Sequence, residues 1–328
     1  MLGVKTLKKT PEVIEAINSL MEMETAGDPM TELKWTHRTT EKIADQLRAL
    51  DIFISANTVA KLLKEMKFSL RVNSKKIPSQ QHPDRDEQFQ YIAQIREQFA
   101  FEGNPIISVD CKKKEAIGNF KNNGQVWSPT PIKVNDHDFA HLGEGKAIPL
   151  GIYDLQHNRG SVFIGTSHET ADFVVDSINR WWRYQGTHQY KGKKKILILS
   201  DSGGCDGYNR KAWKYHLQHK LCNRFGGIQA TVCHYPPGSS KWNPIEHRLF
   251  SEISKNWKGK PLDSYETALK YINTTTTKTG LSVKSYLNTR KYQTGQKFSD
   301  QQINELELQK HDTLPMFNYT LSPNKILN

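Results

Sequence analysis

The chain has 328 residues and a formal net charge of +12, from 46 Lys and Arg against 34 Asp and Glu. The positive excess favours a polyanionic partner, most simply nucleic acid. A hydrophobic fraction of 36% is enough for a packed core and excludes a wholly disordered chain. No apolar run approaches the roughly 18 residues of a membrane span, no secretory signal opens the chain, and four scattered cysteines indicate a reducing cytoplasm rather than a disulfide scaffold.

The first 83 residues predict a helical DNA-binding region. Residues 11–24 form an amphipathic helix, and residues 40–51 and 56–67 form two short helices joined by a tight turn, which is a helix-turn-helix pattern. Donor-rich side chains of the kind that a recognition helix presents to DNA face outward from the second of these helices: Asn57, Thr58, Lys61 and Lys64. An ordinary helical hairpin with a solvated face is the alternative. The basic segment 69–85 lacks periodicity and predicts a linker.

From residue 84 the pattern changes to alternating strands and helices. After a helix at 84–102, we expect strands at 105–110, 146–155, 159–167, 194–201 and 228–236, and helices at 169–186, 209–226 and 241–259. A hairpin followed by strand–helix alternation indicates an α/β domain, with a mixed sheet flanked by helices. We place this catalytic domain at 84–260, with an insertion at about 111–145. A C-terminal extension follows at 261–328, with helices near 264–276 and 299–310.

Three acids stand at positions suited to chemistry. Asp110 and Asp201 each follow an apolar strand, and Glu246 lies in the first turn of a helix. Ligands of open α/β sheets gather at the carboxyl ends of strands, and three carboxylates there suit Mg²⁺ or Mn²⁺, with two ions about 4 Å apart activating attack on a phosphate. Alternatively, the aspartates are turn or cap residues, and Glu246 completes a capping box with Asn243.

Further side chains offer weaker signals. Reserve candidates for a metal ligand are Asp154, at the end of a strand, and Asp138, in the insertion. A zinc site is a minor alternative, because one helix and the next strand carry four side chains of ligand type: His216, His219, Cys222 and Cys233. Phosphate contacts are expected from four lysines near the acids, although such lysines often only solvate a surface: Lys112, Lys113, Lys114 and Lys241.

Several blocks of the sequence resemble a DDE transposase. The segments SVDCKKKEAIGNFKN, GKAIPLGIYDL, LILSDSGGCDGY and CHYPPGSSKWNPIEHRLFSEISKNWKG are similar to those of the ISAzo-type insertion-sequence family, the Rhodopirellula-type transposases. The resemblance runs from about residue 27 to the final FNYTLSP, and the WNPIEHRLF block also resembles mariner-like transposases. This sequence departs from the family in two places, since Cys205 and Asp206 replace small or amide residues and the chain starts late in the DNA-binding region.

The resemblance implies both a fold and a reaction. It implies a ribonuclease-H-like domain of the retroviral integrase superfamily, with a helix-turn-helix at 40–67, and it matches Asp110, Asp201 and Glu246 to the family's metal-binding acids. The implied activity is cleavage of DNA at the ends of the element and transfer of the freed strand to target DNA, by a homo-oligomer at the nucleoid. The alternatives are a nuclease or resolvase that cuts without joining, and a DNA-binding protein without catalysis.

Overall fold

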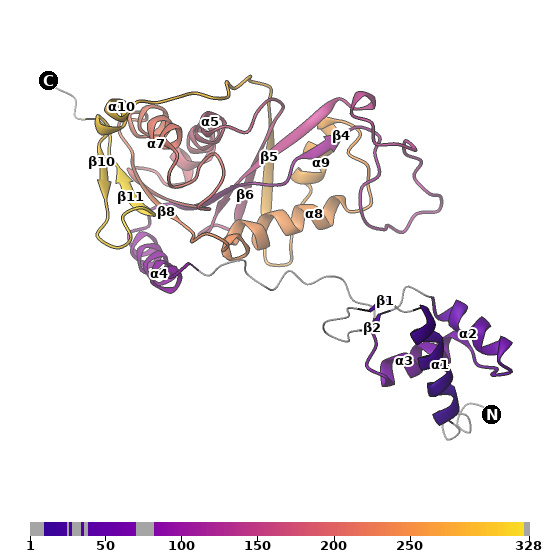
Figure 1. The fold of residues 1–328 in the computed structure, drawn as a ribbon. Coiled ribbons are helices and arrows are strands. Elements are labelled where there is room, and N and C mark those ends of the chain that lie inside the picture. Colours follow the sequence, from indigo (N-terminus) through magenta and orange to yellow (C-terminus); the bar gives the residue numbers. More distant parts are fainter. Residues whose placement is uncertain (1–9, 25, 28–33, 36–38, 70–81, 325–328) are drawn as a thin grey trace. The chain divides into compact units, whose positions relative to one another are not determined.

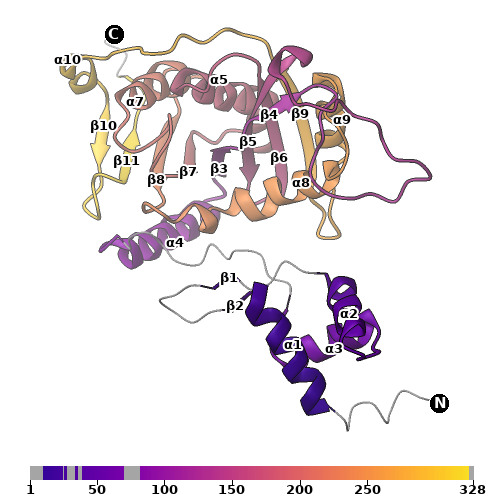
Figure 2. The same ribbon diagram turned by 45° about the vertical axis from the view of Figure 1, so that its right-hand side comes forward.

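A computed structural model describes residues 10–24, 26–27, 34–35, 39–69 and 82–324 (Figures 1 and 2). The chain divides into two compact units, Met1–Ile77 and Pro78–Asn328. Most of the linker predicted at 69–85 lies outside the described residues.

The N-terminal unit is built on three helices, α1 (Thr10–Glu24), α2 (Thr40–Ala49) and α3 (Ala56–Glu65), with the two-residue strands β1 (Ala26–Gly27) and β2 (Lys34–Trp35). Thr39 caps α2 and Ser55 caps α3, each accepting a hydrogen bond from a backbone N–H in the first turn. Apolar side chains from all three helices form one core, including Ile17, Leu47 and Leu62. The predicted pair of short helices and the turn between them are therefore present.

The second unit contains a mixed sheet that has nine strands in the described residues. The strands are β3 (Ile106–Cys111), β4 (Glu115–Ile117), β5 (Gly145–Asp154), β6 (Arg159–Gly165), β7 (Lys195–Ser200), β8 (Gln229–His234), β9 (Ser282–Asn288), β10 (Leu308–Lys310) and β11 (Asn318–Leu321). Their order is β10-β11-β8-β7-β3-β5-β6-β9, and β4 pairs with β5. Strands β3, β5 and β6 form an antiparallel meander, whereas β7 and β8 run parallel to β3. The order β6-β5-β3-β7-β8 is that of the predicted ribonuclease-H-like sheet.

Helices cover both faces of the sheet (Figure 2). They are α4 (Arg85–Phe101), α5 (Ala171–Trp181), α6 (Thr187–Gln189), α7 (Lys211–Leu217), α8 (Ser251–Trp257), α9 (Tyr265–Asn273) and α10 (Asp300–Asn304). One core joins the sheet to α5 and α7, and clusters on the other face join it to α8 and α9 and to α4. π-Helical turns extend α5 and α7 at Trp182–Gly186 and Gln218–Cys222, and another precedes α8 at Glu246–Phe250.

The segment after residue 260 contributes to both edges of this sheet. β9 pairs in parallel with β6, and β11 pairs antiparallel with β8, so the chain crosses from one edge to the other (Figure 2). Sequence patterns predicted helices in this region but none of its strands. The strands escaped prediction because β10 and β11 are only three and four residues long, and β9 mixes polar and apolar residues at an edge.

Candidate active site

Asp110 and Asp201 lie at the carboxyl ends of two neighbouring parallel strands. Ser108 of β3 is the register partner of Leu199 of β7. Asp110 and Asp201 each stand two residues further along, so the same register carries the two carboxyl groups to one end of the sheet. Side chains alternate between the faces of a strand, so Asp110 shares its face with Ser108.

A glycine lets the segment that carries Glu246 approach this pair. Gly151 of β5 is the register partner of Asp110. A Cβ atom at Gly151 would lie 2.5 Å from Phe250 Cε1 and 2.8 Å from Ile245 Cδ1, distances that real Cβ atoms do not show. The absent side chain therefore allows the π-helical turn to lie directly on β5, with Glu246 beside the strand that carries Asp110.

The electrostatics of the acids show that they influence one another. Burial, together with the neighbouring charges of Asp201, Asp206 and Glu246, raises the pKa of Asp110 to about 9. Burial also raises the pKa of Asp201, with Glu246 adding to the effect and the Asn243 amide opposing it. A cluster of carboxylates that repel one another in a buried setting lacks a counter-charge.

Asn243 connects the strands to the helical segment. Its buried side-chain amide donates a hydrogen bond to Asp201 Oδ1 at 3.0 Å, and its Oδ1 accepts a short hydrogen bond from Ser108 Oγ. Glu246 contacts Asn243 only through backbone groups, its N–H donating to the Asn243 carbonyl at 3.1 Å. The Asn243 side chain therefore orients Asp201 and does not form the capping box that was the alternative for Glu246.

Two further polar side chains, His234 and Asp206, make hydrogen bonds next to Asp201. The fully buried His234 contacts the Asp201 carbonyl through Nδ1 at 3.0 Å and the Tyr319 hydroxyl through Nε2 at 3.1 Å. Burial lowers the pKa of His234 to about 4, so the ring is neutral, with Nδ1 donating to the carbonyl and Nε2 accepting from the hydroxyl. The Asp206 side chain is hydrogen-bonded to Ser200 Oγ, and burial raises its pKa to about 7.

The donor chemistry of the site fits a divalent cation. Asp110, Asp201 and Glu246 offer the hard oxygen ligands that Mg²⁺ and Mn²⁺ prefer, and none of the three forms an ion pair within the described residues. Their side chains are not gathered as ligands, since no group of three or more His, Cys, Asp or Glu in the described part of the chain is arranged to hold a metal ion. Asp110 Oδ1 instead accepts a hydrogen bond from the Cys111 backbone N–H at 2.7 Å.

The lysines named by the sequence analysis differ in their surroundings. Lys112 pairs with Glu115 and lies 4.8 Å from the centre of the Trp257 ring, and only 12% of its side chain is exposed. Lys113 is exposed, and Lys114 pairs with Glu169 at 3.2 Å. Lys241 is exposed and lies over the ring of the neighbouring Trp242. Lys113 and Lys241 are therefore the more accessible of these cations.

In the N-terminal unit, Asn57, Lys61 and Lys64 are exposed on α3. Thr58 is half-buried, and its hydroxyl is hydrogen-bonded to the capping Ser55 at 3.0 Å. The exposed side chains of α3 are thus one amide, two cations and, at its last residue, the carboxylate of Glu65.

The reserve acids lie elsewhere. Asp154 is buried at the far end of β5, where it accepts a hydrogen bond from the Tyr190 hydroxyl at 2.7 Å, and Asp138 is exposed in the insertion. The four side chains of the zinc alternative make separate contacts. His216 is bonded to Gln296 and His219 packs on Tyr215, while the two cysteines lie in different hydrophobic clusters.

The sequence suggested Asn243 only as a cap, and it suggested His234 either as a DNA or water contact close to the acids or as a structural residue. The WNPIEH block contains the one signal that could have identified Asn243, namely an amide that precedes a chemically important acid at a fixed spacing. Asp206 was noted only as a departure from the family pattern.

A ribonuclease-H-like sheet with acids at the ends of its central strands, joined to a helical N-terminal unit, is the architecture of a DDE transposase. Residues 16–323 match the family described as Rhodopirellula transposase DDE domain, and the chain belongs to that family. It is therefore an insertion-sequence transposase, a polynucleotidyl transferase of the DDE class, whose members depend on divalent metal ions.

Solved structures of the Mos1 transposase are similar to this chain. The pre-cleavage transpososome is 16% identical, with a TM-score of 0.42, over 79% of this chain and 69% of that one. The strand transfer complex is 16% identical, with a TM-score of 0.42, over 79% of this chain and 68% of that one. The paired-end complex with Mg is 15% identical, with a TM-score of 0.39, over 78% of this chain and 68% of that one. No curated protein sequence matches the chain. No helix in the described ranges is long and apolar enough to cross a membrane.

Proposed function

We propose that Asp110, Asp201 and Glu246 are the catalytic acids of this transposase and that they hold two Mg²⁺ or Mn²⁺ ions. The observation that carries the proposal is the raised pKa of Asp110, which results from burial and from the charges of the other two acids. Bound divalent cations would supply the missing positive charge, activate the attacking oxygen and stabilise the leaving oxygen during phosphoryl transfer.

The chain's own residues prepare this site in two ways. Asn243 holds one oxygen of Asp201, which limits rotation of that carboxylate. The neutral His234 ring supports the Asp201 backbone by donating from Nδ1 to the Asp201 carbonyl. Both contacts orient the segment that carries Asp201, and neither uses the carboxylate oxygens of Glu246.

The DNA would be held by cations outside the acid cluster. On α3, Asn57, Thr58, Lys61 and Lys64 would read and contact the ends of the element. Near the acids, Lys112, Lys113, Lys114 and Lys241 would face phosphates, with the exposed Lys113 and Lys241 as the main contacts. Lys112 is better placed to position the strand that follows Asp110, because it is held by Glu115 and Trp257.

The proposed reaction has two stages at the nucleoid. Hydrolysis at the end of the element frees a 3′-OH, and the same site directs this hydroxyl onto a phosphate of target DNA. Because an element has two ends, we propose that a homo-oligomer holds both of them. We keep the helical region at 1–83, the catalytic domain at 84–260 and the extension at 261–328 as the functional divisions.

Labelled DNA carrying the element end tests the proposal. Asp110→Asn, Asp201→Asn and Glu246→Gln are expected to lower Mg²⁺-dependent cleavage and joining by roughly a hundredfold or more. Asp138→Asn is the matched control, since it neutralises an exposed acid in the insertion. Full activity in any of the three variants would remove that acid from the assignment. Cleavage by the wild type without joining of the 3′ end would identify a nuclease, and binding without cleavage a catalytically inactive protein.

A further inference from the structure

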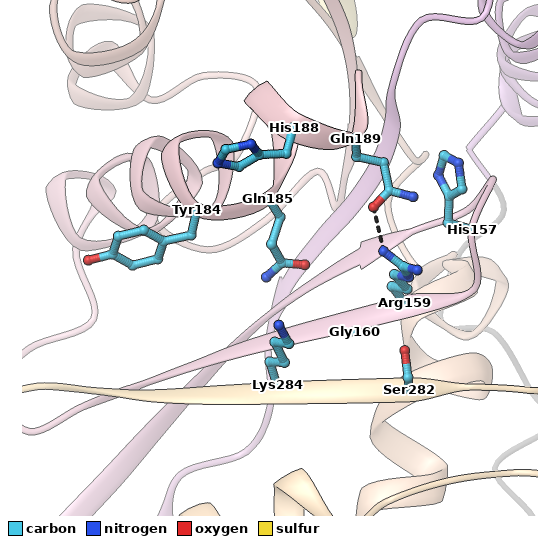
Figure 3. Close-up of a pocket in the computed structure, with 9 residues that line it drawn as sticks. All are labelled: His157, Arg159, Gly160, Tyr184, Gln185, His188, Gln189, Ser282 and Lys284. Atoms are coloured by element: carbon cyan, nitrogen blue, oxygen red, sulfur yellow. Dashed lines mark hydrogen bonds between the residues drawn. The ribbon is translucent and has the colours of Figure 1, made fainter. Parts of the chain in front are cut away.

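A cavity of about 560 Å³ lies between the starts of β6 and β9 and the helical segment after α5 (Figure 3). Four basic side chains line it, and no carboxylate side chain does: His157, Arg159, His188 and Lys284. Figure 3 shows Arg159 and Lys284 rising from neighbouring strands towards Gln185 and Gln189 on the helical wall. Cations and amides without acids suit an anionic ligand rich in oxygen acceptors.

The polar groups of this cavity are held in place. Arg159 donates to Gln189 Oε1 at 2.7 Å, and Gln185 donates to Ser161 Oγ at 2.6 Å. Neither Arg159 nor Lys284 forms an ion pair with an acid among the described residues. The buried Asp154, which is the register partner of Arg159, pairs with His157 at 3.1 Å, so the two permanent charges of the cavity keep no ion-pair partner of their own among the described residues.

The wall also has features suited to nucleic acid. Tyr184 lines the cavity with 44% of its surface exposed, and the Arg183 guanidinium lies 5.7 Å from the centre of its ring. Aromatic rings interleaved with cations are typical of surfaces that bind nucleic acid. The residues come from a π-helical turn, which is an irregularity common at functional sites.

The cavity and the candidate catalytic acids lie at opposite ends of the sheet. On β5, Gly151 is the register partner of Asp110 and Asp154 is the register partner of Arg159. Gly151 and Asp154 are three residues apart, which is about 10 Å along the strand. The two sites also use different faces. Ser108, on the face of Asp110, contacts Asn243, whereas Phe163, on the face of Arg159, packs in the core with α5.

We propose that this cavity binds backbone phosphates of a second DNA segment, separate from the segment held at the acids. The inference rests on the proposed function in one respect, since DNA is the substrate of both sites. Arg159 and Lys284 bind phosphate oxygens, the side-chain NH2 of Gln189 completes the contacts, and Tyr184 stacks against a sugar or base at the rim. A transposase that joins an end to a target handles two DNA segments, and a cationic site on the face away from the acids is placed for one of them.

The test compares two double variants of the full chain in an Asp201→Asn background, which separates binding from catalysis. Arg159→Gln with Lys284→Gln removes the two cavity charges. Arg224→Gln with Lys310→Gln is the matched control, because it removes two exposed charges outside the cavity lining. Affinity for a labelled duplex is measured by anisotropy over a range of salt concentrations. Melting curves verify that both variants are folded.

The cavity variant is expected to bind duplex on the order of tenfold more weakly and to lose about 1.8 from the slope of log affinity against log salt, the value for two phosphate contacts. The control should change both quantities much less. In the active background, the cavity variant should still cleave a pre-bound element end but join it to target more slowly. An unchanged salt slope, or an equal change in the control, would overturn the inference while leaving the catalytic acids untouched.

A free nucleotide is the other source of the same phosphate chemistry. Calorimetry with deoxyadenosine monophosphate distinguishes it from DNA. If the mononucleotide binds the wild type, is lost from the cavity variant, and duplex binding is the same in both, the site is a nucleotide site and the proposal is wrong. If the mononucleotide binds neither protein and duplex binding falls only in the cavity variant, the proposal stands.

Discussion

The side-chain amide of Asn243 donates a hydrogen bond to Asp201 Oδ1 at 3.0 Å. This contact joins the residue after β7 to the segment that carries Glu246, and it connects two stretches that are 42 residues apart in the chain. The buried amide also accepts from Ser108 of β3, so one side chain ties together the elements bearing all three acids.

Asn243→Ala should therefore impair catalysis more than folding. Loss of the orienting amide is expected to lower metal-dependent cleavage about 10- to 100-fold. The Ser108 hydroxyl loses its acceptor, which should lower the free energy of unfolding by about 1–3 kcal/mol. Cleavage rates across a Mg²⁺ titration, together with urea unfolding, measure the two effects.

Ser108→Ala is the control for the Asn243 variant. It removes the hydroxyl from the same network but leaves the amide free to hold Asp201. Its stability should fall comparably while its cleavage rate stays near that of the wild type. Equal losses of activity in the two variants would show that Asn243 acts only through packing.

A divalent cation should stabilise the folded protein independently of any DNA. Binding to the folded state alone adds about 2.7 kcal/mol when the free ion is at 100 times its dissociation constant. Thermal unfolding with Mg²⁺ or Mn²⁺ should therefore give a higher Tm than unfolding with a chelator. The difference measures occupation of the proposed site.

Asp110→Asn should abolish this shift. Without metal, the variant should melt at or above the wild-type temperature, because the raised pKa of Asp110 makes the folded wild type take up a proton at neutral pH, a cost that asparagine does not carry. Asp138→Asn should retain the full metal response. A metal response of equal size in Asp110→Asn would place the cation elsewhere.

The positions of Asp110 and Asp201 could be predicted because each follows an apolar run long enough to identify a buried strand. Neighbouring parallel strands then bring their ends together without further information. The position of Glu246 depends on Gly151, where the absence of a side chain permits close packing. In the sequence, this glycine cannot be distinguished from one that serves a turn.

The sequence did not predict the role of Asn243 or the edge strands, and the reasons differ. An asparagine before a helix is equally suited to capping its own backbone and to reaching a distant acid, so local sequence does not decide between them. Strand β9 pairs with β6 and β11 pairs with β8, which are far away in the chain, and β10 pairs only with β11. Local patterns also missed the π-helical turns, because their spacing differs from 3.6 residues.

The recognition surface of α3 predicts two separable effects on DNA binding. Asn57→Ala should reduce discrimination between the element end and unrelated DNA by about 1–3 kcal/mol, because an amide reads base edges. Lys61→Ala should weaken binding to both DNAs alike and reduce the salt slope by about 1. Competition binding with specific and unrelated duplexes distinguishes the two.

Lys42→Ala on α2 is the matched control for these variants, since it removes an exposed lysine from the neighbouring helix. It should leave discrimination unchanged. If Asn57→Ala retained full discrimination, α3 would be an ordinary hairpin helix with a solvated face.

His311 predicts a pH dependence of stability. Its Nδ1 lies 2.7 Å from the Tyr91 hydroxyl and its Nε2 lies 2.8 Å from Thr320 Oγ1. Burial lowers the pKa of His311 below its ordinary value of 6.5, although Asp312 opposes the shift. The folded state therefore favours the neutral ring, while the unfolded chain takes up a proton below about pH 6.5. Stability from this group is complete above that pH and is lost as pH falls towards the lower folded pKa.

His311→Gln isolates this contribution, because glutamine offers a donor and an acceptor but does not titrate. The wild type should exceed the variant in free energy of unfolding by a larger amount at pH 7.5 than at pH 5.5, as measured by urea unfolding. The raised pKa of buried Asp206 acts with the opposite sign, but it is common to both proteins and cancels in the difference. Tyr91→Phe is the control, since it removes a hydrogen bond to the ring while leaving the imidazole to titrate. A difference between wild type and His311→Gln that is the same at both pH values would show that the ring does not couple protonation to folding.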